Sequence, residues 1–170
     1  MSDVLKYEFN NCSVNIYTED PNALQESLSS AATTVVSKLI PPRIGALWVE
    51  QGGVYVGVLR GENGAPDYHL IHAHTDYETS EVTWDQATDN AKADNEGYTD
   101  WSLPDRSEAR LLYINSPSGF NTDKWYWTST QGAAYDGCAW MQVFVNGFQL
   151  DFRKSYSGRA RAVRRVLIID

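Results

Sequence analysis

The dipeptide Asn146-Gly147 separates two runs of alternating apolar and polar residues near the end of the chain. This pattern is the strongest short-range signal for a β-hairpin, because a two-residue type I′ turn requires positive φ at both central positions. Such a loop pairs apolar residues across the strands, namely Val145 with Phe148, Val143 with Leu150 and Met141 with Phe152. We therefore expect this apolar face of the hairpin to lie in the core.

The opposite face of the predicted hairpin carries aromatic, amide and charged side chains. It pairs Phe144 with Gln149, Gln142 with Asp151, and Trp140 with Arg153. The last pair is positioned for a cation–π contact. Large aromatic residues and arginine dominate the energetics of interfaces, so these six residues are predicted to form a ligand-binding surface. The alternative is that another part of the same chain covers the aromatic side chains.

Two helices are predicted between the strands of the main domain. Each begins with a capping box, in which Thr83 is followed by Gln86 and Asp105 by Glu108. The helices are predicted to end near residues 93 and 113. Strands are predicted at residues 46–50, 53–60, 68–74, 125–130, 139–145, 148–154 and 159–169. The fold class is therefore α+β, with a mostly antiparallel sheet.

The first 42 residues have a different pattern. Alternating residues around Asn10-Asn11 predict a small hairpin, and Asp20-Pro21 supplies an N-cap and a first helical residue. The helix would end at Pro41-Pro42 and carries apolar residues at helical spacing, which are Leu24, Leu28, Ala31, Val35 and Leu39. It either lies on its own domain or forms a homo-oligomer, for example a trimer. We therefore divide the chain into an attachment or oligomerisation segment, 1–42, and a main domain, 43–170.

The net charge of −8 argues against a general nucleic-acid-binding protein, because binding to phosphates requires a basic surface. The charge is unevenly distributed. Residues 76–108 contain ten acidic side chains, and residues 153–165 contain six of the fourteen basic ones. We expect Arg159, Arg161 and Arg165 to pair with the acidic stretch. The alternative is a basic site for a polyanion such as a sulfated glycan, which the acidic protein as a whole would repel.

Three motifs occur in order in the main domain, VTWDQA at 82–87, GYTDWSLP at 97–104 and WYWTST at 125–130. They are followed by Ala139-Trp140, the Asn146-Gly147 hairpin and the segment 161–164. Together these motifs resemble the Lcl C-terminal-like domain family, which is common in bacteria and phages. The resemblance covers about residues 44–166. It implies a fold similar to C-type lectins and to formylglycine-generating enzymes.

The resemblance also implies a function. Phage members of this group include receptor-binding tropism determinants, whose binding surface lies on the last strands. By this comparison the chain is expected to be a non-enzymatic binding module of a phage or prophage virion, such as a tail, fibre or decoration protein. Its partner would be a protein or glycan of the host surface, or another virion protein. The alternative is an intracellular partner-binding protein, such as a phage-encoded inhibitor of a host system.

Two positions depart from the family pattern. Many relatives carry cysteines where this chain has Ala91 and Ala162. We expect the two alanines to touch, and the domain to be assembled in a reducing compartment. The N-terminus has no basic stretch followed by an apolar run, so no signal peptide and no membrane insertion are expected. The protein would then be made in the host cytoplasm.

A metal site is the remaining alternative for the main domain. His72 and His74 would point to one side of a predicted strand, with His69 before them and Asp76 beyond. No fourth ligand is evident, so these histidines are expected to be structural, and no metal or other cofactor is predicted. Formylglycine-generating relatives use a pair of cysteines near the C-terminal end, where this chain has only Cys138. We therefore expect no enzymatic activity.

Overall fold

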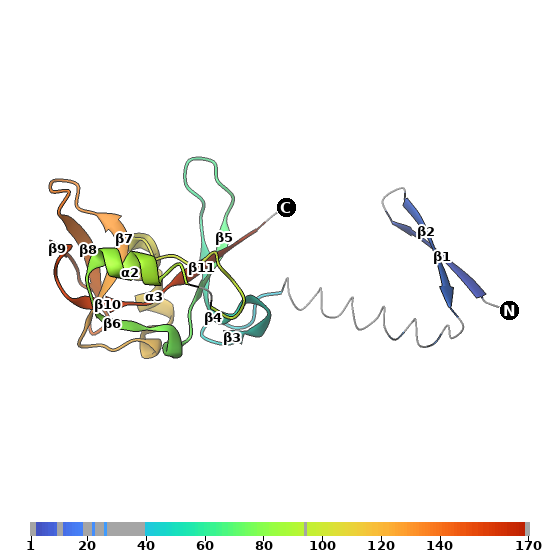
Figure 1. The fold of residues 1–170 in the computed structure, drawn as a ribbon, viewed down its shortest axis with the longest axis horizontal. Helices are drawn as coiled ribbons and strands as arrows, with labels where there is room; N and C mark the ends of the chain where they lie inside the picture. Colours follow the sequence, from blue (N-terminus) through green and yellow to red (C-terminus); the bar gives the residue numbers. More distant parts are fainter. Residues whose placement is uncertain are drawn as a thin grey trace. The chain divides into compact units, whose positions relative to one another are not determined.

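The computed structural model describes residues 3–9, 12–18, 22, 26, 40–93 and 95–168. The chain divides into two compact units, Met1–Ile40 and Pro41–Asp170 (Figure 1). In the first unit, β1 (Asp3–Phe9) pairs antiparallel with β2 (Cys12–Thr18), which confirms the predicted N-terminal hairpin. Residues 22 and 26 are helical. The side chains predicted to associate with other copies, Leu24, Leu28, Ala31, Val35 and Leu39, lie outside the described residues.

The second unit contains a four-stranded antiparallel sheet in the order β11-β5-β4-β3. Its strands are β3 (Leu47–Trp48), β4 (Gly53–Leu59), β5 (Tyr68–His72) and β11 (Val163–Leu167). The predicted strand 46–50 is wrong in its second half, because a 3-10 turn, η1 (Val49–Gln51), follows β3. The turn ends at Gly52 with a φ of 75°, a conformation that glycine adopts without steric cost.

A five-stranded sheet has the order β6-β10-β7-β8-β9, so β9 is an edge strand. Its strands are β6 (Thr79–Val82), β7 (Trp125–Gln131), β8 (Cys138–Val143), β9 (Gln149–Arg153) and β10 (Gly158–Ala160). Neighbouring strands are antiparallel except β10 and β7, which are parallel. The second unit is therefore a mixed α/β fold with mostly antiparallel sheets, as predicted. Two further 3-10 turns are η2 (Thr75–Tyr77) and η3 (Pro117–Gly119).

The predicted strand 159–169 is divided between the two sheets. It pairs as β10 in the five-stranded sheet and as β11 in the four-stranded sheet. The buried Arg161 lies between the two strands, and its guanidinium donates to the carbonyl of Gly119 at 2.5 Å and to the Glu78 carboxylate. The Ala162 carbonyl then accepts from the N–H of Ala73 at 2.9 Å. One continuous segment thus crosses between the sheets.

Helices α2 (Trp84–Asn90) and α3 (Arg106–Asn115) both start at the predicted capping boxes. At α3, the N–H of Asp105 donates to Glu108 Oε2 at 2.7 Å, and the N–H of Glu108 donates to Asp105 Oδ1 at 2.8 Å. These bonds satisfy N–H groups that the first helical turn leaves without partners. The helix starts are confirmed, although α2 ends earlier and α3 later than predicted. No helix in the described ranges is long and apolar enough to cross a membrane.

The two helices pack on opposite faces of the five-stranded sheet. Tyr126 and Trp127 are neighbours in β7, so their side chains point to opposite faces. Trp127 lies in a core cluster with Ala87 of α2, whereas Tyr126 lies in a second cluster with Leu112 of α3. How far each helix extends over the β8–β9 hairpin therefore decides which hairpin side chains remain exposed.

Candidate functional site

The β8–β9 hairpin is present, but its register differs from the predicted one. Met141 pairs with Leu150, which is displaced by two residues from the predicted partner. The N–H of Val143 donates to the carbonyl of Phe148 at 3.0 Å and closes a four-residue loop over 144–147. A displacement of two residues keeps every side chain on its predicted side of the ribbon, because side chains alternate with a period of two.

The turn explains the change of register. A type I′ turn needs positive φ at both Asn146 and Gly147, but of the two only Gly147 has it, at 75°. The Asn146 side-chain oxygen instead accepts a hydrogen bond from the N–H of Phe148 at 3.0 Å. Asparagine often stabilises turns in this way. The dipeptide therefore predicted a turn correctly, but not its length.

The mixed face of the hairpin is buried at its centre. Gln142 is 0% exposed and Phe144 is 3% exposed, so the prediction that this face is open to solvent is wrong at both positions. Phe144 stacks on Phe120 with ring centroids 4.0 Å apart, and it meets the ring of Tyr126 edge-on at 5.2 Å. Gln142 accepts a hydrogen bond from Gln149 at 2.7 Å. These side chains belong to the core beneath α3.

Helix α3 covers more of this face through Arg106. Its guanidinium carbon lies 3.5 Å from the centre of a Trp140 ring. Its Nε donates to Gln149 Oε1 at 3.1 Å, and Gln149 Nε2 donates back to the Arg106 carbonyl at 2.9 Å. Arg153 lies opposite Cys138 and is exposed. The predicted Trp140–Arg153 contact is therefore wrong, because the new register moves Arg153 away and α3 supplies the cation.

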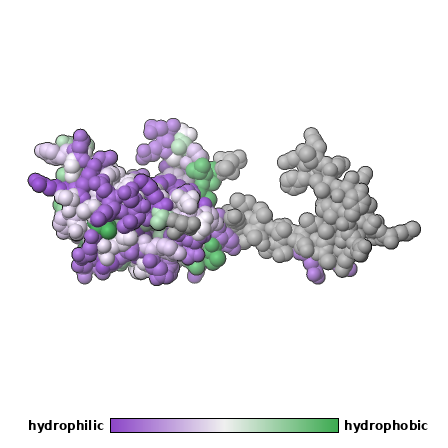
Figure 2. Space-filling model, viewed as in Figure 1, coloured by the Kyte–Doolittle hydropathy of each residue, from purple (hydrophilic) through white to green (hydrophobic). Residues whose placement is uncertain are grey.

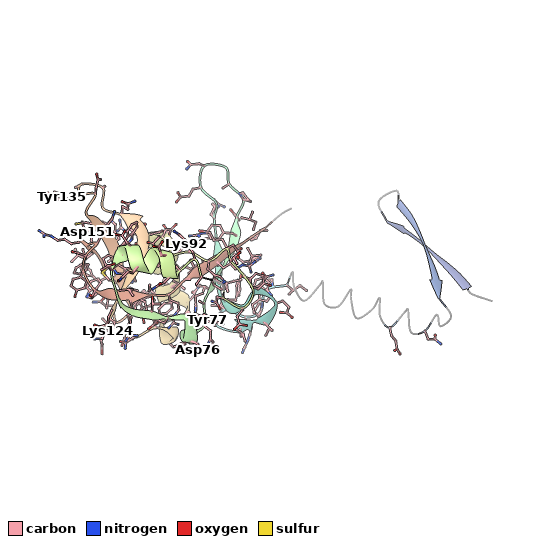
Figure 3. All side chains as sticks on the ribbon, in the orientation of Figure 1. Asp76, Tyr77, Lys92, Lys124, Tyr135 and Asp151 are labelled. Atoms are coloured by element: carbon pink, nitrogen blue, oxygen red, sulfur yellow. The ribbon has the colours of Figure 1, made fainter. Side chains whose placement is uncertain are left out.

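Asp151 and Arg153 are the parts of the predicted surface that reach the outside of the domain. Asp151 lies opposite Trp140 and is half-buried. Figure 3 shows Asp151 at the end of the domain that the β8–β9 hairpin occupies. The other four predicted binding residues are wholly or partly covered by α3 and the segment around Phe120. A binding surface on this face of the hairpin would therefore be small.

The apolar face of the same hairpin is exposed along β9. Phe148 is 54% exposed and Leu150 is 41% exposed, although the β8 residues on this face are buried. The Trp125 ring lies 6.2 Å from that of Phe148 and 4.9 Å from that of Phe152. Phe152 in turn stacks on Tyr156 at 5.0 Å. We call Trp125, Phe148, Leu150, Phe152 and Tyr156 the aromatic edge.

A polar pocket of about 350 Å³ adjoins the aromatic edge. Trp125 and Tyr156 line it together with side chains of both charges. The polar lining includes Ser80, Glu81, Asp123, Lys124, Ser157 and Arg159. Lys124 marks its place in Figure 3. The lining is therefore mostly polar, and its two aromatic residues are shared with the aromatic edge.

Glu81 in this pocket has an unusual backbone conformation. Its φ is 58°, a value that costs a residue with a side chain about 1–3 kcal/mol. It lies in β6, whose pairing with β10 shifts register between Gly158 and Ala160. Strained residues of this kind are concentrated at binding and catalytic sites. The strain is therefore a second feature that marks this pocket as a site.

The sequence motifs did not reveal the aromatic edge. The alternation of Phe148, Leu150 and Phe152 was visible, but the same alternation is expected for a strand in the core. The two cases differ in whether a further strand or helix covers β9. The outer side of β9 is left without a neighbouring strand because β10 pairs with β7 instead. No pattern within the hairpin shows where β10 pairs. A signal available in principle was the aromatic residue Tyr156 immediately beyond the charged end of β9.

His72 is a structural residue in the core. Its ring bonds to the carbonyl of Ala73 at 2.8 Å through Nδ1 and to Ser116 Oγ at 3.0 Å through Nε2. Burial lowers the pKa of His72 to about 4, and the nearby Arg161 charge acts in the same direction. The ring is therefore neutral at physiological pH, with both nitrogens already in contact with protein atoms.

The other two histidines have separate partners. His69 Nδ1 lies 3.1 Å from the Tyr55 hydroxyl, and burial lowers the pKa of His69. His74 is exposed and pairs with Asp76 at 3.2 Å. Within the described ranges, no three His, Cys, Asp or Glu side chains are grouped so that they could hold a metal ion. The histidine strand therefore offers no shared site.

The acidic stretch and the basic run pair with each other, as predicted. The pairs are Arg159 and Arg161 with Glu78, Arg164 with Asp100, and Arg165 with Glu108. Glu108 is fully buried, and Glu78 is nearly so. These arginines are therefore used within the fold. The face of the second unit seen in Figure 2 is mostly hydrophilic, with hydrophobic residues in small separate patches.

Comparison with known protein families supports the motif resemblance. The Lcl C-terminal domain family matches residues 48–164, from the end of β3 into β11. The matched segment includes both capped helices and the whole aromatic edge. No curated protein matches the chain significantly. Since the match extends over more than half of the sequence, the chain belongs to the Lcl C-terminal domain family.

Proposed function

We propose that the second unit is a non-enzymatic binding module with a C-type-lectin-like fold, and that a protein partner docks on its aromatic edge. The observation that carries this proposal is a row of exposed aromatic and aliphatic side chains on an edge strand. Contiguous apolar surfaces are uncommon on monomeric proteins and mark interaction sites. Removing such a surface from water contributes about 25 cal/mol per Å² of apolar area.

The chemistry of the aromatic edge favours a protein as the partner. Aromatic residues are enriched at the centres of protein interfaces, and a polar rim surrounds them. The adjoining pocket supplies such a rim through Asp123, Lys124 and Arg159. The outer side of β9 has no neighbouring strand in the described sheet. A partner strand could therefore add main-chain hydrogen bonds beside the aromatic contacts.

The aromatic edge is already ordered before a partner arrives. Trp125 holds the rings of Phe148 and Phe152, and Phe152 holds Tyr156. Ring contacts of this geometry contribute about 0.5–1.5 kcal/mol each. A surface with fixed side chains loses less conformational entropy on association, which raises its affinity.

We further propose that the protein is part of a phage or prophage virion, where it recognises a host-surface protein or another virion protein. Support for this placement comes from the phage members of the family. The alternative is an intracellular partner-binding protein, such as an inhibitor of a host system. Neighbouring genes distinguish the two: tail or capsid genes beside this gene would support the virion placement, and their absence from the region would contradict it.

Site-specific photo-crosslinking tests the docking surface. A photoreactive phenylalanine analogue replaces Phe148 in one variant and Ile114 in another, and each is produced in the native host. Ile114 is a matched control because it is 62% exposed and lies on α3, away from the aromatic edge. We expect one dominant protein adduct at position 148 that is absent at position 114. Adducts of equal yield at both positions, or none at 148, would exclude docking on the aromatic edge.

A further inference from the structure

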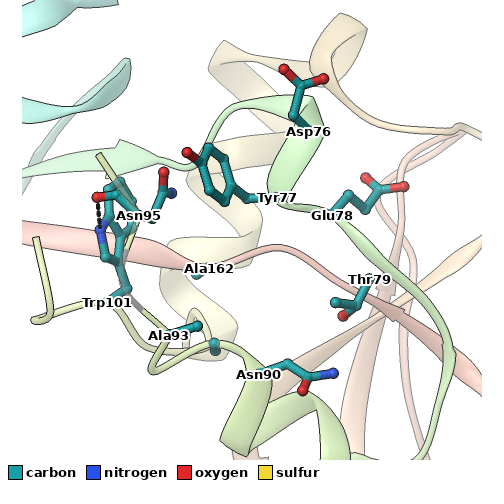
Figure 4. Close-up of a pocket in the computed structure, with 10 residues that line it drawn as sticks. Asp76, Tyr77, Glu78, Thr79, Asn90, Ala93, Asn95, Trp101 and Ala162 are labelled. Atoms are coloured by element: carbon teal, nitrogen blue, oxygen red, sulfur yellow. Dashed lines mark hydrogen bonds between the residues drawn. The ribbon is translucent and has the colours of Figure 1, made fainter. Parts of the chain in front are cut away.

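A second pocket, of about 270 Å³, lies between η2, β6, the end of α2 and the chain before Trp101 (Figure 4). None of its lining residues belongs to the aromatic edge or to the pocket beside it. Figure 3 shows Asp76 and Tyr77, which line the second pocket, well apart from Asp151 on β9. We call it the Asn95 pocket. Its ligand would not compete with a protein on the aromatic edge.

Asn95 contributes two polar groups that lack partners. It is 4% exposed, and neither its amide nitrogen nor its amide oxygen has a hydrogen-bond partner among the described residues. The buried hydroxyl of Thr79 likewise has no hydrogen-bond partner among the described residues, and both side chains line this pocket. Leaving such a group unpaired costs about 1–3 kcal/mol. Three unpaired polar atoms around one cavity therefore indicate a ligand that supplies the missing hydrogen bonds.

The backbone fixes the position of the Asn95 amide. Asn95 and Tyr98 exchange two backbone hydrogen bonds of 3.1 Å, and the Trp101 indole donates to the Asn95 carbonyl at 3.1 Å (Figure 4). Between them, Glu96 and Gly97 both have positive φ, as in a type I′ turn. The amide is therefore held in place before a ligand binds, which lowers the entropic cost of binding.

The floor of the pocket is small and apolar. Ala91 and Ala162 lie in one core cluster with Trp101, and all three residues line the pocket. Figure 4 shows Ala162 and Ala93 between Asn95 and Thr79. A methyl group would fit on this floor without leaving a polar atom buried. The predicted Ala91–Ala162 pair thus forms part of a cavity floor.

The charge of the lining excludes most anions. Among the described lining residues, Asp76 and Glu78 are charged, and none is a lysine or arginine. The carboxylate of Glu78 is already paired with two arginines. Tyr77 also lines the pocket and is 42% exposed (Figure 4). A suitable ligand is therefore uncharged and carries a neighbouring donor and acceptor, a small apolar group and a face for an aromatic ring.

We infer that the Asn95 pocket binds the acetamido group of an N-acetylated amino sugar. The acetamido carbonyl accepts from Asn95 Nδ2, and a sugar hydroxyl donates to Asn95 Oδ1. The methyl group packs on the floor formed by Ala91, Ala162 and Trp101. The acetamido N–H points away from the carbonyl in the trans amide and donates to Thr79 Oγ1, and the sugar ring lies against Tyr77. This assignment satisfies all three unpaired polar atoms, and it does not depend on the function proposed for the aromatic edge.

Saturation-transfer NMR with N-acetylglucosamine tests this assignment. The protons of the acetyl methyl group are expected to receive the strongest saturation, whereas glucosamine and glucose, which lack the acetamido group, should show little. Asn95→Ala and Thr79→Val should each weaken binding about tenfold or more, because each substitution removes a hydrogen bond to the ligand and leaves a polar group of the ligand buried without a partner. Asn121→Ala, an exposed asparagine outside the pocket, serves as the matched control and should bind as the parent protein does.

Thermal unfolding of the same variants separates binding from folding. Because the Asn95 amide and the Thr79 hydroxyl have no partner in the described residues, their removal should leave Tm unchanged or raise it. Absence of methyl saturation in the parent protein would overturn the proposal, as would unchanged binding in both variants. A large fall in Tm for both variants would also overturn it, by showing that these groups support the fold. Stronger binding of an acetyl-lysine peptide than of the sugar would assign the pocket to a modified protein instead.

Discussion

The guanidinium of Arg106 lies 3.5 Å from the centre of a Trp140 ring, and this contact holds the first turn of α3 against the outer strands of the five-stranded sheet. The same arginine exchanges hydrogen bonds with Gln149. One helix thus seals the mixed face of the β8–β9 hairpin. The other face, on the side of β9, keeps its apolar residues exposed.

A double-mutant cycle should detect this contact. A cation over a partly exposed tryptophan is stabilised by about 1 kcal/mol, so Arg106→Ala and Trp140→Ala are expected to be coupled by about that amount. Urea unfolding of the two single variants and the double variant gives the coupling energy. Arg153→Ala should change the free energy of unfolding by less than about 0.5 kcal/mol, because this side chain is exposed. Strictly additive effects of the two substitutions would contradict the contact.

Gly147 is expected to be sensitive to a single added methyl group. Its φ is 75°, and a Cβ atom there would lie 2.5 Å from a ring carbon of Tyr113. Both the left-handed backbone and the clash oppose a side chain, so Gly147→Ala should destabilise the protein by about 2 kcal/mol or more. Gly137→Ala is the matched control, because a Cβ atom at that position meets no atom within 4 Å. Equal unfolding midpoints for the two variants would rule out this account of the turn.

The sequence predicted elements whose signals are local. Both capping boxes join residues three positions apart, so their hydrogen bonds could be anticipated from Thr83 with Gln86 and Asp105 with Glu108. Opposite charges concentrated in two stretches also predicted that the basic run would pair within the fold. That both Arg159 and Arg161 contact the same carboxylate could not be predicted, because it depends on how the chain crosses between the sheets.

The candidate site was harder to predict, since it depends on contacts between distant parts of the chain. The pattern showed that Gln142 and Leu150 would lie on opposite sides of a ribbon, and this is correct. It could not show which side a helix forty residues upstream would cover. Asn95 was not singled out, because nothing in the sequence indicates that a buried amide lacks a partner.

The stability of the protein should fall as the solution becomes acidic. His72 has a pKa of about 4 in the folded protein, below the ordinary value of about 6.5 that it regains on unfolding. The unfolded chain therefore binds more protons than the folded protein between these values. The contribution of His72 to stability is fully present above pH 6.5 and is lost as the pH falls toward 4. The full effect of this group is roughly 3 kcal/mol.

Urea unfolding at several pH values tests the role of His72. The parent protein should lose stability across this window more steeply than His72→Gln, which cannot titrate. His74→Gln is the matched control, because His74 is exposed, and its pH dependence should follow that of the parent protein. If His72→Gln and the parent protein lose stability in parallel, another group causes the acid sensitivity.

The Glu108–Arg165 pair should contribute far more than an exposed ion pair. Glu108 is 0% exposed and bonds to Arg165 at 2.5 Å and to the Tyr68 hydroxyl at 3.0 Å. Glu108→Gln retains the side chain that a capping box requires but leaves the partly buried Arg165 without its counter-ion, so a loss of about 2 kcal/mol or more is expected. Asp89→Asn, which breaks the exposed pair with Lys92, should cost less than about 0.5 kcal/mol. Chemical denaturation measures both changes, and similar values for the two variants would show that burial does not strengthen the Glu108–Arg165 pair.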